Sequence, residues 1–379
     1  KNPKSRDPLS NRQSIRLGFR NLGISLGFII LTFAATQPYA ILDFYHYAVD
    51  TYNQTAMVRR MIDFPYTRQY DGSLPFLYHI WQFSVWGVGL PLAIVMWGGM
   101  CLSTVKIIVK RNPSDLLLIA WVFPFFLITG LAEVKFLRYM LPITPFLAVM
   151  GASLAFQAME SFRSFLWPRP RFLYKFTGLL IILVILSTAF YAIAFSNVYS
   201  EPHPAIKAAK YLNNTAPKDA IIAKEHWEEN LPGLQTQPTI ILQLYDSDRT
   251  EIQYKNHLGQ TIIGSKTDHI VNALLNADYI VLFSNRLYGS IPTLPDRYPL
   301  SSRYYKLLFN GQLGFEVDYV SQSYPNFLGV SFVNNTFSRS GLNPPTVLES
   351  PKPTSFTLNM GHADDSFVNY EHPMTIIFK

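Results

Sequence analysis

The sequence predicts an integral membrane α-helical bundle of five transmembrane helices, followed by an extracytoplasmic α/β domain with a partly parallel sheet. Composition gives the first indication: the 379 residues are 49% hydrophobic and 15% charged, whereas soluble domains average about 25% charged residues. The distribution of charge gives the second. Residues 1–200 hold 18 Lys and Arg against 8 Asp and Glu, a net of +10, and residues 201–379 hold 14 against 17, a net of −3. We therefore expect a membrane region at 1–200 and a polar domain at 201–379.

The individual helices are predicted from uncharged windows in the first 200 residues. A helix needs roughly 20 apolar residues to cross the hydrocarbon core of a bilayer. Five windows have about this length or more, which is too many for the buried helices of a soluble protein. We expect helices near residues 21–42, 77–103, 116–132, 139–159 and 176–200.

The basic residues predict the topology, because Lys and Arg accumulate in short cytoplasmic segments. Of the 18 basic residues before residue 200, 13 lie in the N-terminal segment, the second-to-third connection and the fourth-to-fifth connection. The N-terminus is therefore expected in the cytoplasm of a multi-pass plasma-membrane protein, with residues 201–379 outside. This assignment accounts for the net charge of +7 and removes the reason to expect a nucleic-acid partner. The single cysteine, Cys101, excludes a disulfide within the chain and a zinc site built from several cysteines.

The first outer loop, residues 43–71, is both aromatic and charged. Two interpretations remain open. In one, apolar side chains of residues 44–64 form an interfacial helix on the membrane surface. In the other, Arg68, Tyr66, Gln69 and Tyr70 bind substrate: the guanidinium forks onto a phosphate, and the amide and phenols contact a sugar ring.

The next outer connection is short and contains Glu133, Lys135 and Arg138. On a helical turn, Lys135 and Arg138 share one face, and two cations at the mouth of a helix bundle suit a lipid-linked phosphate. The alternative is that both side chains extend to anionic headgroups. Glu133 is then their counter-ion or a polar group of the cavity.

These residues carry a family resemblance. The run KFLRYMLPITP at 135–145 resembles the corresponding stretch of GT-C membrane glycosyltransferases of the family 39 group, which includes protein O-mannosyltransferases and lipid A aminoarabinose transferases. The stretches DFPYTRQY, EHWEENLP at 225–232 and ADDSFVNYEHPMTIIFK resemble bacterial members described as phospholipid-carrier-dependent glycosyltransferases.

The resemblance implies a multi-helix enzyme that takes a sugar from a polyprenyl-phosphate donor at the outer membrane face. Lys135 and Arg138 match the family motif and are implied to contact the donor phosphate. The family's catalytic Asp or Glu lies in an earlier outer loop, so we expect the catalytic acid upstream of residue 1 and assign none here. The expected partners are membrane lipid and a lipid-linked sugar; the acceptor is not identified.

Residues 201–379 alternate between helix and strand patterns, as expected for a small α/β domain. Glu225 and His226 follow a predicted strand end, where ligands often bind in such sheets, and are additional substrate-binding candidates. The acids and histidines at 362–372 are expected in a solvated loop before the last strand; metal binding is the alternative there. No clear motif in the sequence indicates a bound cofactor or a metal.

Two further classes of function stay open. One is a non-catalytic transporter or a sensor whose outer domain binds a ligand. Against a transporter, the uncharged windows lack the intramembrane ionisable groups that mark many ion-coupled pathways. The other is a glycosyltransferase-like pseudoenzyme that serves polysaccharide assembly.

Overall fold

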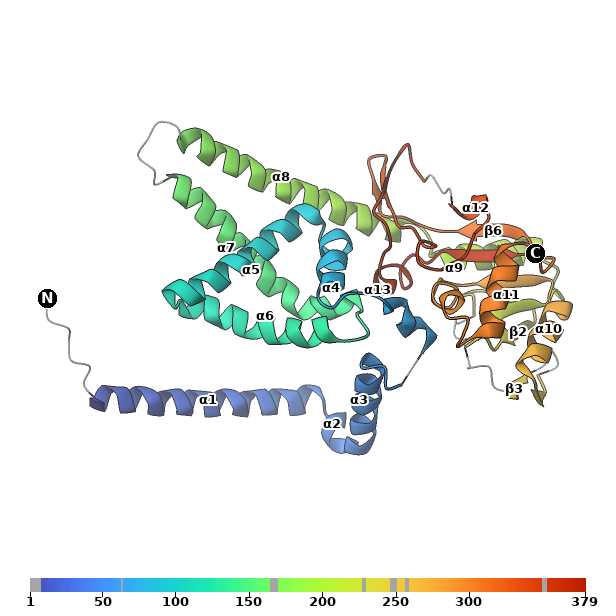
Figure 1. Cartoon of the computed structure of the whole chain (residues 1–379), viewed down its shortest axis with the longest axis horizontal. Helices are drawn as coiled ribbons and strands as arrows, with labels where there is room; N and C mark the ends of the chain where they lie inside the picture. The colour runs from blue at the N-terminus through green and yellow to red at the C-terminus, as the bar shows by residue number, and fades with distance from the viewer. Residues whose placement is uncertain are drawn as a thin grey trace. The chain divides into compact units, whose positions relative to one another are not determined.

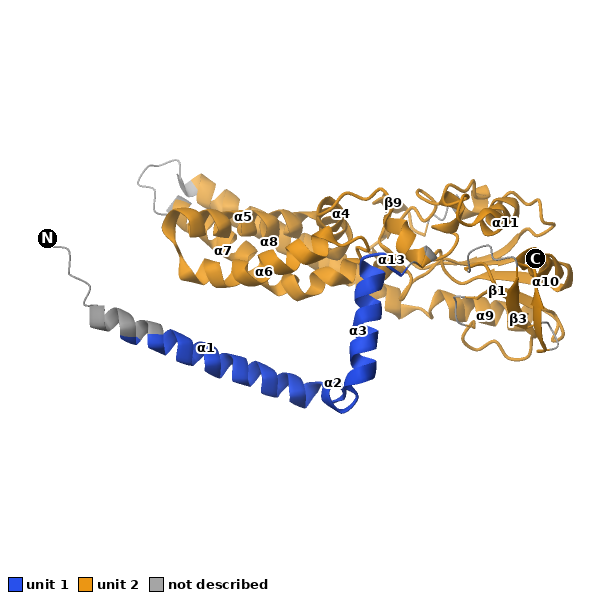
Figure 2. Cartoon of the chain, turned by 60° about the horizontal axis from the view of Figure 1, so that its bottom comes forward, with its two compact units in different colours: residues 1–62 blue, residues 63–379 orange. Residues whose placement is uncertain are grey.

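The computed structural model describes residues 8–62, 64–163, 170–226, 230–245, 251–255, 259–349 and 353–379. Contacts along the chain divide it into two compact units, Lys1–Ile62 and Asp63–Lys379 (Figure 2). The second unit contains both the later helices of the predicted membrane region and the C-terminal α/β domain, so these two parts pack together.

The first unit consists of three helices, α1 (Pro8–Thr36), α2 (Tyr39–Leu42) and α3 (Phe44–Val58). From Arg16 onward α1 is long and apolar enough to cross a membrane. The predicted surface helix corresponds to α3, and it is shorter than expected because the chain turns at residues 59–62. Exposed aromatic side chains, Phe44, Tyr45 and Tyr52 among them, lie along α3. Its position at a membrane surface stays a prediction.

The helical part of the second unit contains several long helices, among them α5 to α8 (Figure 1). In chain order it comprises η1 (Pro65–Tyr70), α4 (Leu77–Gln82), η2 (Phe83–Gly87), α5 (Leu90–Lys110), α6 (Pro113–Leu131), η3 (Leu137–Ile143), α7 (Thr144–Arg163) and α8 (Pro170–Ser196). With α1, the helices α5 to α8 make five in the described part of the chain that are long and apolar enough to span a membrane.

One predicted helix is corrected by the structure. The expectation of a single helix near 77–103 is wrong, because the chain breaks at Val88 and Gly89 into α4 with η2 and then α5. Gly89 has φ +82°, a left-handed conformation that side chains other than glycine rarely adopt. The spanning segment is therefore Leu90–Lys110. The segment η2 is a single π-helical turn, a feature often found at functional sites.

Small residues bring α5 and α7 into close contact. A Cβ added to Gly99 would lie 2.3 Å from the backbone of Met150, and one added to Gly151 would lie 3.1 Å from the Cα of Met96. Close approach at small residues is the usual way in which membrane helices pack, because lipid offers no hydrophobic force between them.

The C-terminal domain is an α/β fold with a partly parallel five-stranded sheet, in the order β2-β1-β5-β10-β6. Strands β2, β1 and β5 are parallel, and β10 runs antiparallel to both of its neighbours. The elements are η4 (Asn197–Ser200), α9 (Pro204–Thr215), β1 (Ile222–Glu225), β2 (Thr239–Leu242), β3 (Ile252–Lys255), β4 (Thr261–Gly264), α10 (Lys266–Asn276), β5 (Tyr279–Leu282), η5 (Ile291–Thr293), α11 (Pro299–Phe309), β6 (Val317–Ser321), β7 (Asn326–Phe327), β8 (Val330–Val333), α12 (Thr346–Glu349), β9 (Phe356–Asn359), α13 (Asp365–Val368) and β10 (Thr375–Phe378).

Successive side chains of a strand point to opposite faces of the sheet. Both faces of this sheet are buried, each in its own hydrophobic core. Ala223, Ile280 and Ile376 belong to the core that includes residues of α10 and α11. Ile222 and Ile377 belong to a separate core with the alanines of α9. The domain therefore has three layers, with α9 on one face and α10 and α11 on the other.

Two segments join this domain to the helices. The small sheet β7-β8-β9 packs on the end of α8, where Tyr191 meets Phe332 edge-on at 5.0 Å between ring centres. The segment between β9 and β10 extends into the bundle, and its Ala363 and Val368 share a buried cluster with residues of η2, α5 and α7. The chain therefore returns from the C-terminal domain to complete the core of the helical part.

Candidate functional site

A cavity of about 490 Å³ lies among η2, η3, the start of α7 and the C-terminal part of α8. Most of its lining is apolar, as in Leu92, Leu141, Ala192 and Phe195. Among the described residues that line it, Arg138 is the one charged side chain. A cavity of this kind offers an apolar chain a place next to a cation.

Arg138 is held by aromatic residues. Its guanidinium carbon lies 4.2 Å from the ring centre of Phe136, and its Nη1 donates a hydrogen bond to the Tyr370 hydroxyl at 2.8 Å. A planar guanidinium stacked on a ring keeps its outer N–H donors directed to one side. Arg138 is exposed, so an anion can reach it.

Asp364 forms the base on which this arrangement rests. Its side chain is completely buried. One carboxylate oxygen, Oδ2, accepts hydrogen bonds from the hydroxyls of Tyr78 at 2.8 Å and Tyr70 at 3.3 Å. The other, Oδ1, accepts from the backbone N–H of Leu137 at 3.1 Å, from that of Ser366 at 2.9 Å, and from the Ser366 hydroxyl.

This network fixes the residue that precedes Arg138. Because Leu137 donates its N–H to Asp364 and Arg138 donates its own to the Ser366 hydroxyl at 3.3 Å, the start of η3 is bound to the start of α13. Burial raises the pKa of the Tyr70 phenol and the charge of Asp364 raises it further. Tyr70 therefore keeps its proton and remains a donor.

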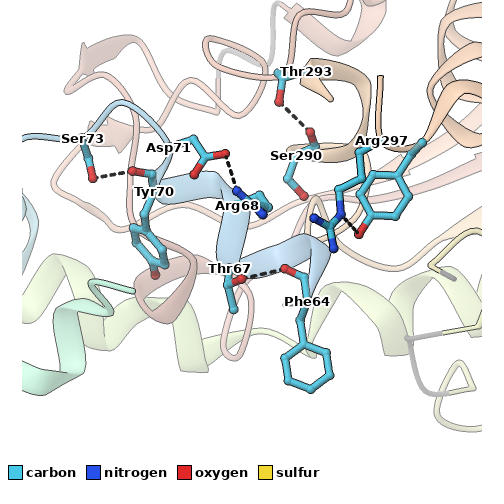
Figure 3. Close-up of polar contacts among 10 residues, drawn as sticks. Phe64, Thr67, Arg68, Tyr70, Asp71, Ser73, Ser290, Thr293 and Arg297 are labelled. Atoms are coloured by element: carbon cyan, nitrogen blue, oxygen red, sulfur yellow. Dashed lines mark hydrogen bonds and ion pairs between the residues drawn. The ribbon is translucent and has the colours of Figure 1, made fainter. Parts of the chain in front are cut away.

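The predicted substrate-binding residues of the first outer loop lie in η1, which has Pro65 in its first turn. Figure 3 shows its local bonds, including Thr67 Oγ1 to the carbonyl of Phe64 at 2.7 Å and the ion pair of Arg68 with Asp71 at 3.5 Å. From the same turn, Gln69 donates to the Asp365 carboxylate at 2.7 Å. The turn is therefore bonded to the segment that carries Asp364.

The predicted residues of η1 fall into two groups. Tyr70 and Gln69 donate hydrogen bonds to the aspartates at 364 and 365, and their contact with a substrate stays a prediction. Tyr66 is half-buried and its ring lies 6.4 Å from that of Phe136, which places it beside Arg138. Arg68 is paired with Asp71, and its contact with a phosphate stays a prediction.

The expectation that Lys135 and Arg138 share a face of one helical turn is wrong. The helix η3 begins at Leu137, so Lys135 precedes it, whereas Arg138 is part of it. Lys135 is buried and its Nζ donates to the carbonyl of Glu133 at 3.4 Å, while the Glu133 side chain is exposed. Lys135 does not line the cavity; its role toward a phosphate stays a prediction.

Glu225 and His226 lie in the C-terminal domain. Glu225 is buried at the end of β1 and accepts a hydrogen bond from the hydroxyl of Tyr305 in α11. The His226 ring packs against that of Tyr245, with 5.4 Å between centres. Neither residue lines the cavity next to Arg138. Residues 227–229 of the EHWEENLP stretch lie outside the described part of the chain.

The expectation of a solvated loop at 362–372 is wrong. Asp364, Asp365 and His372 are buried, and the carbonyl of His362 accepts hydrogen bonds from Gln82 and Trp86, both at 3.0 Å. The loop is buried because it fills the junction between the two parts of the second unit. The described residues contain no group of three or more His, Cys, Asp or Glu side chains placed to hold a metal ion.

Three residues of the site were missed in the sequence, namely Asp364, Tyr370 and Arg286. Arg286 follows β5, and its guanidinium carbon is 5.7 Å from the Tyr370 ring centre. A signal for Asp364 exists: Asp at the N-cap with Ser two residues later is a helix-start pattern, and Asp364 does cap α13. Nothing local distinguishes Tyr370 or Arg286 from other surface residues.

Comparison with known proteins adds no relative to this description. No family model matches the sequence, no curated protein matches it, and no solved structure matches it.

Proposed function

We propose that the chain is part of a membrane glycosyltransferase that moves a sugar from a polyprenyl-phosphate donor to an acceptor at the outer membrane face. The observation that carries this proposal is the apolar cavity among membrane helices with Arg138 in its wall. A lipid-linked phosphate has the two matching parts, an apolar chain and an anionic head.

The proposed chemistry is direct displacement at the anomeric carbon. The acceptor oxygen forms a bond to that carbon and gives its proton to a base, the Asp or Glu that the family resemblance implies, while the bond from the carbon to the lipid phosphate oxygen breaks. Negative charge then develops on the departing phosphate. A fixed guanidinium directed at that charge stabilises the transition state more than the ground state, which is the usual basis of electrostatic catalysis.

The aromatic neighbours of Arg138 support the same assignment. The rings of Phe136 and Tyr139 lie within 4.2 and 6.0 Å of the Arg138 guanidinium carbon, and they exclude water from the part of the guanidinium that they cover. Coulomb attraction to a phosphate is stronger in such surroundings than in water. The aromatic faces also offer a sugar ring apolar surfaces on which to stack.

The test uses the whole enzyme of which this chain is proposed to be a part, in nanodiscs, with release of polyprenyl phosphate measured from a panel of polyprenyl-phosphate-linked hexoses and pentoses. Arg138→Ala is expected to lower turnover roughly 10²- to 10³-fold, the usual effect of removing one donor to a developing oxyanion. Lys135→Ala should also impair transfer. Unchanged turnover in both variants, with membrane insertion intact, would refute the proposal that Arg138 and Lys135 bind the donor phosphate.

A second pair of variants tests the cavity. Ala192→Trp fills part of the space beside Phe195 and should raise KM for the lipid donor. The matched control is Ile193→Trp, since Ile193 is exposed and does not line the cavity. Equal effects of the two substitutions would mean that the lipid chain does not bind there.

A further inference from the structure

Tyr370 lies next to two guanidinium groups that come from different parts of the fold. Arg138 approaches from η3 in the helical part, and Arg286 approaches from the segment after β5 in the C-terminal domain. Each guanidinium carbon is 5.7 Å from the Tyr370 ring centre. The two cations are therefore separated by no more than twice that distance.

The phenol that neighbours both cations is fixed at its backbone and accessible at its ring. The Tyr370 carbonyl contacts Nε2 of His203 at 3.1 Å, and α13, just before it, is held by Asp364 as described above. The side chain nevertheless remains 53% exposed. A ligand from solution or from the membrane surface can reach the region between the two guanidinium groups.

Tyr66 gives an independent indication that both cations act on one region. Burial raises the pKa of its phenol, whereas the charges of Arg286 and Arg138 both lower it. Tyr66 belongs to η1, so three separate segments of the second unit meet around these two cations. An anion that reaches this region is attracted to both cations.

We propose that Arg286 is a second anion-binding residue and that the phosphate of a lipid-linked ligand binds Arg138 and Arg286 together. This inference rests on the proposed function, and it goes beyond it by making the C-terminal domain part of the ligand site. The chemistry recognised is a phosphate group. Its source, a lipid headgroup or free phosphate, is distinguished by the experiment.

The experiment measures the Kd of a fluorescent short-chain polyprenyl phosphate for the full chain in nanodiscs. Arg286→Gln is expected to weaken binding roughly ten- to hundredfold, because a charge-assisted hydrogen bond is lost. Arg286→Lys keeps the charge but not the forked geometry, so it should lose less. The matched control is Arg303→Gln on the exposed face of α11, which should leave the Kd unchanged.

A double variant tests whether one phosphate binds both residues. Substitutions of side chains that bind the same group have non-additive effects on the binding free energy, whereas the effects of substitutions at independent sites add. Arg138→Gln with Arg286→Gln should therefore weaken binding less than the product of the single effects. Full additivity, or an unchanged Kd for Arg286→Gln, would overturn the inference about Arg286 and leave the proposed function standing.

Other outcomes separate the two proposals. An unchanged Kd for Arg138→Gln would overturn the proposed function itself. Unlabelled polyprenyl phosphate should displace the fluorescent probe at a lower concentration than inorganic phosphate does. If both displace it equally well, the lipid is not the recognised ligand. Thermal unfolding of each variant, measured on the same nanodisc samples, should match the parent protein. A Kd change that instead follows a fall in Tm would refute a direct contact of Arg286 with the ligand.

Discussion

The Asp364 network makes a quantitative prediction about how the two parts of the second unit are held together. In Asp364→Ala, five hydrogen-bond donors lose their acceptor: the hydroxyls of Tyr70, Tyr78 and Ser366, and the backbone N–H groups of Leu137 and Ser366. Because the site is buried, water cannot replace the carboxylate without rearrangement.

The magnitude follows from these contacts. A buried donor left without a partner costs about 1–3 kcal/mol, and removing one member of a buried charged network typically costs about 3–5 kcal/mol after local relaxation. We expect destabilisation in the latter range. In Asp364→Asn, one oxygen is retained for the backbone donors, and the new N–H₂ group can donate to the phenol oxygens once those hydroxyls rotate. Its loss should therefore be smaller, about 1–3 kcal/mol.

The assay is thermal unfolding of the full chain in detergent, combined with limited proteolysis. Asp364→Ala should lower the Tm by at least about 5 °C and should make the segment between β9 and β10 susceptible to protease. A matched control exists in Asp318, which accepts a hydrogen bond from the Tyr211 hydroxyl at 2.9 Å but is exposed. Asp318→Ala should change the Tm little, because water replaces the lost partner.

If Asp364→Ala and Asp318→Ala shift the Tm equally, burial of the carboxylate does not determine its contribution. A protease pattern identical to that of the parent protein would show that the segment is held by its apolar contacts alone.

Two further predictions concern packing and pH. Gly99→Ala places a Cβ 2.3 Å from the backbone of Met150. It should therefore force α5 and α7 apart and destabilise the bundle by about 1–3 kcal/mol. The control in the same unfolding assay is Gly178→Ala, where nothing lies within 4 Å of the added atom. Burial, with a smaller effect from the charge of His203, lowers the pKa of His372 to about 4. The unfolded chain, with a histidine pKa near 6.5, then binds more protons than the folded chain between these values, so stability should fall as pH drops from about 6.5 toward 4. His372→Gln should reduce that slope in Tm measured against pH, and an unchanged slope would contradict this account of His372.

Much of the fold follows from local patterns in the sequence. The uncharged windows predicted five helices of spanning length, and the alternation after residue 200 predicted an α/β domain with a partly parallel sheet; both are present. The exception in the membrane region, the break at Gly89, has a local cause that composition conceals. An uncharged window gives the length of apolar chain, whereas the φ of one glycine determines where the helix begins.

The site was predictable only in part, because its residues meet through contacts distant in sequence. Arg138 was identified from nearby basic residues and a short motif, and it lines the cavity. Asp364 was expected in solvent, since two aspartates near glycine and histidine are typical of loops. Its burial depends on phenols of η1 and α4, and its contact with Tyr78 spans 286 positions. No local pattern carries that information.

The position of β10 in the sheet has a consequence for the order of assembly. This strand lies between β5 and β6, and the segment just before it contributes to the core of the helical bundle. During synthesis the helices emerge first, yet neither the sheet nor the bundle core is complete until residues 362–378 have been made. A ribosome that stalls shortly before this stretch therefore leaves two unfinished structures at once: a sheet that lacks an inner strand and a helical bundle with an open junction. Cellular quality control can recognise either defect, so arrested chains should be removed instead of accumulating as a partly active form.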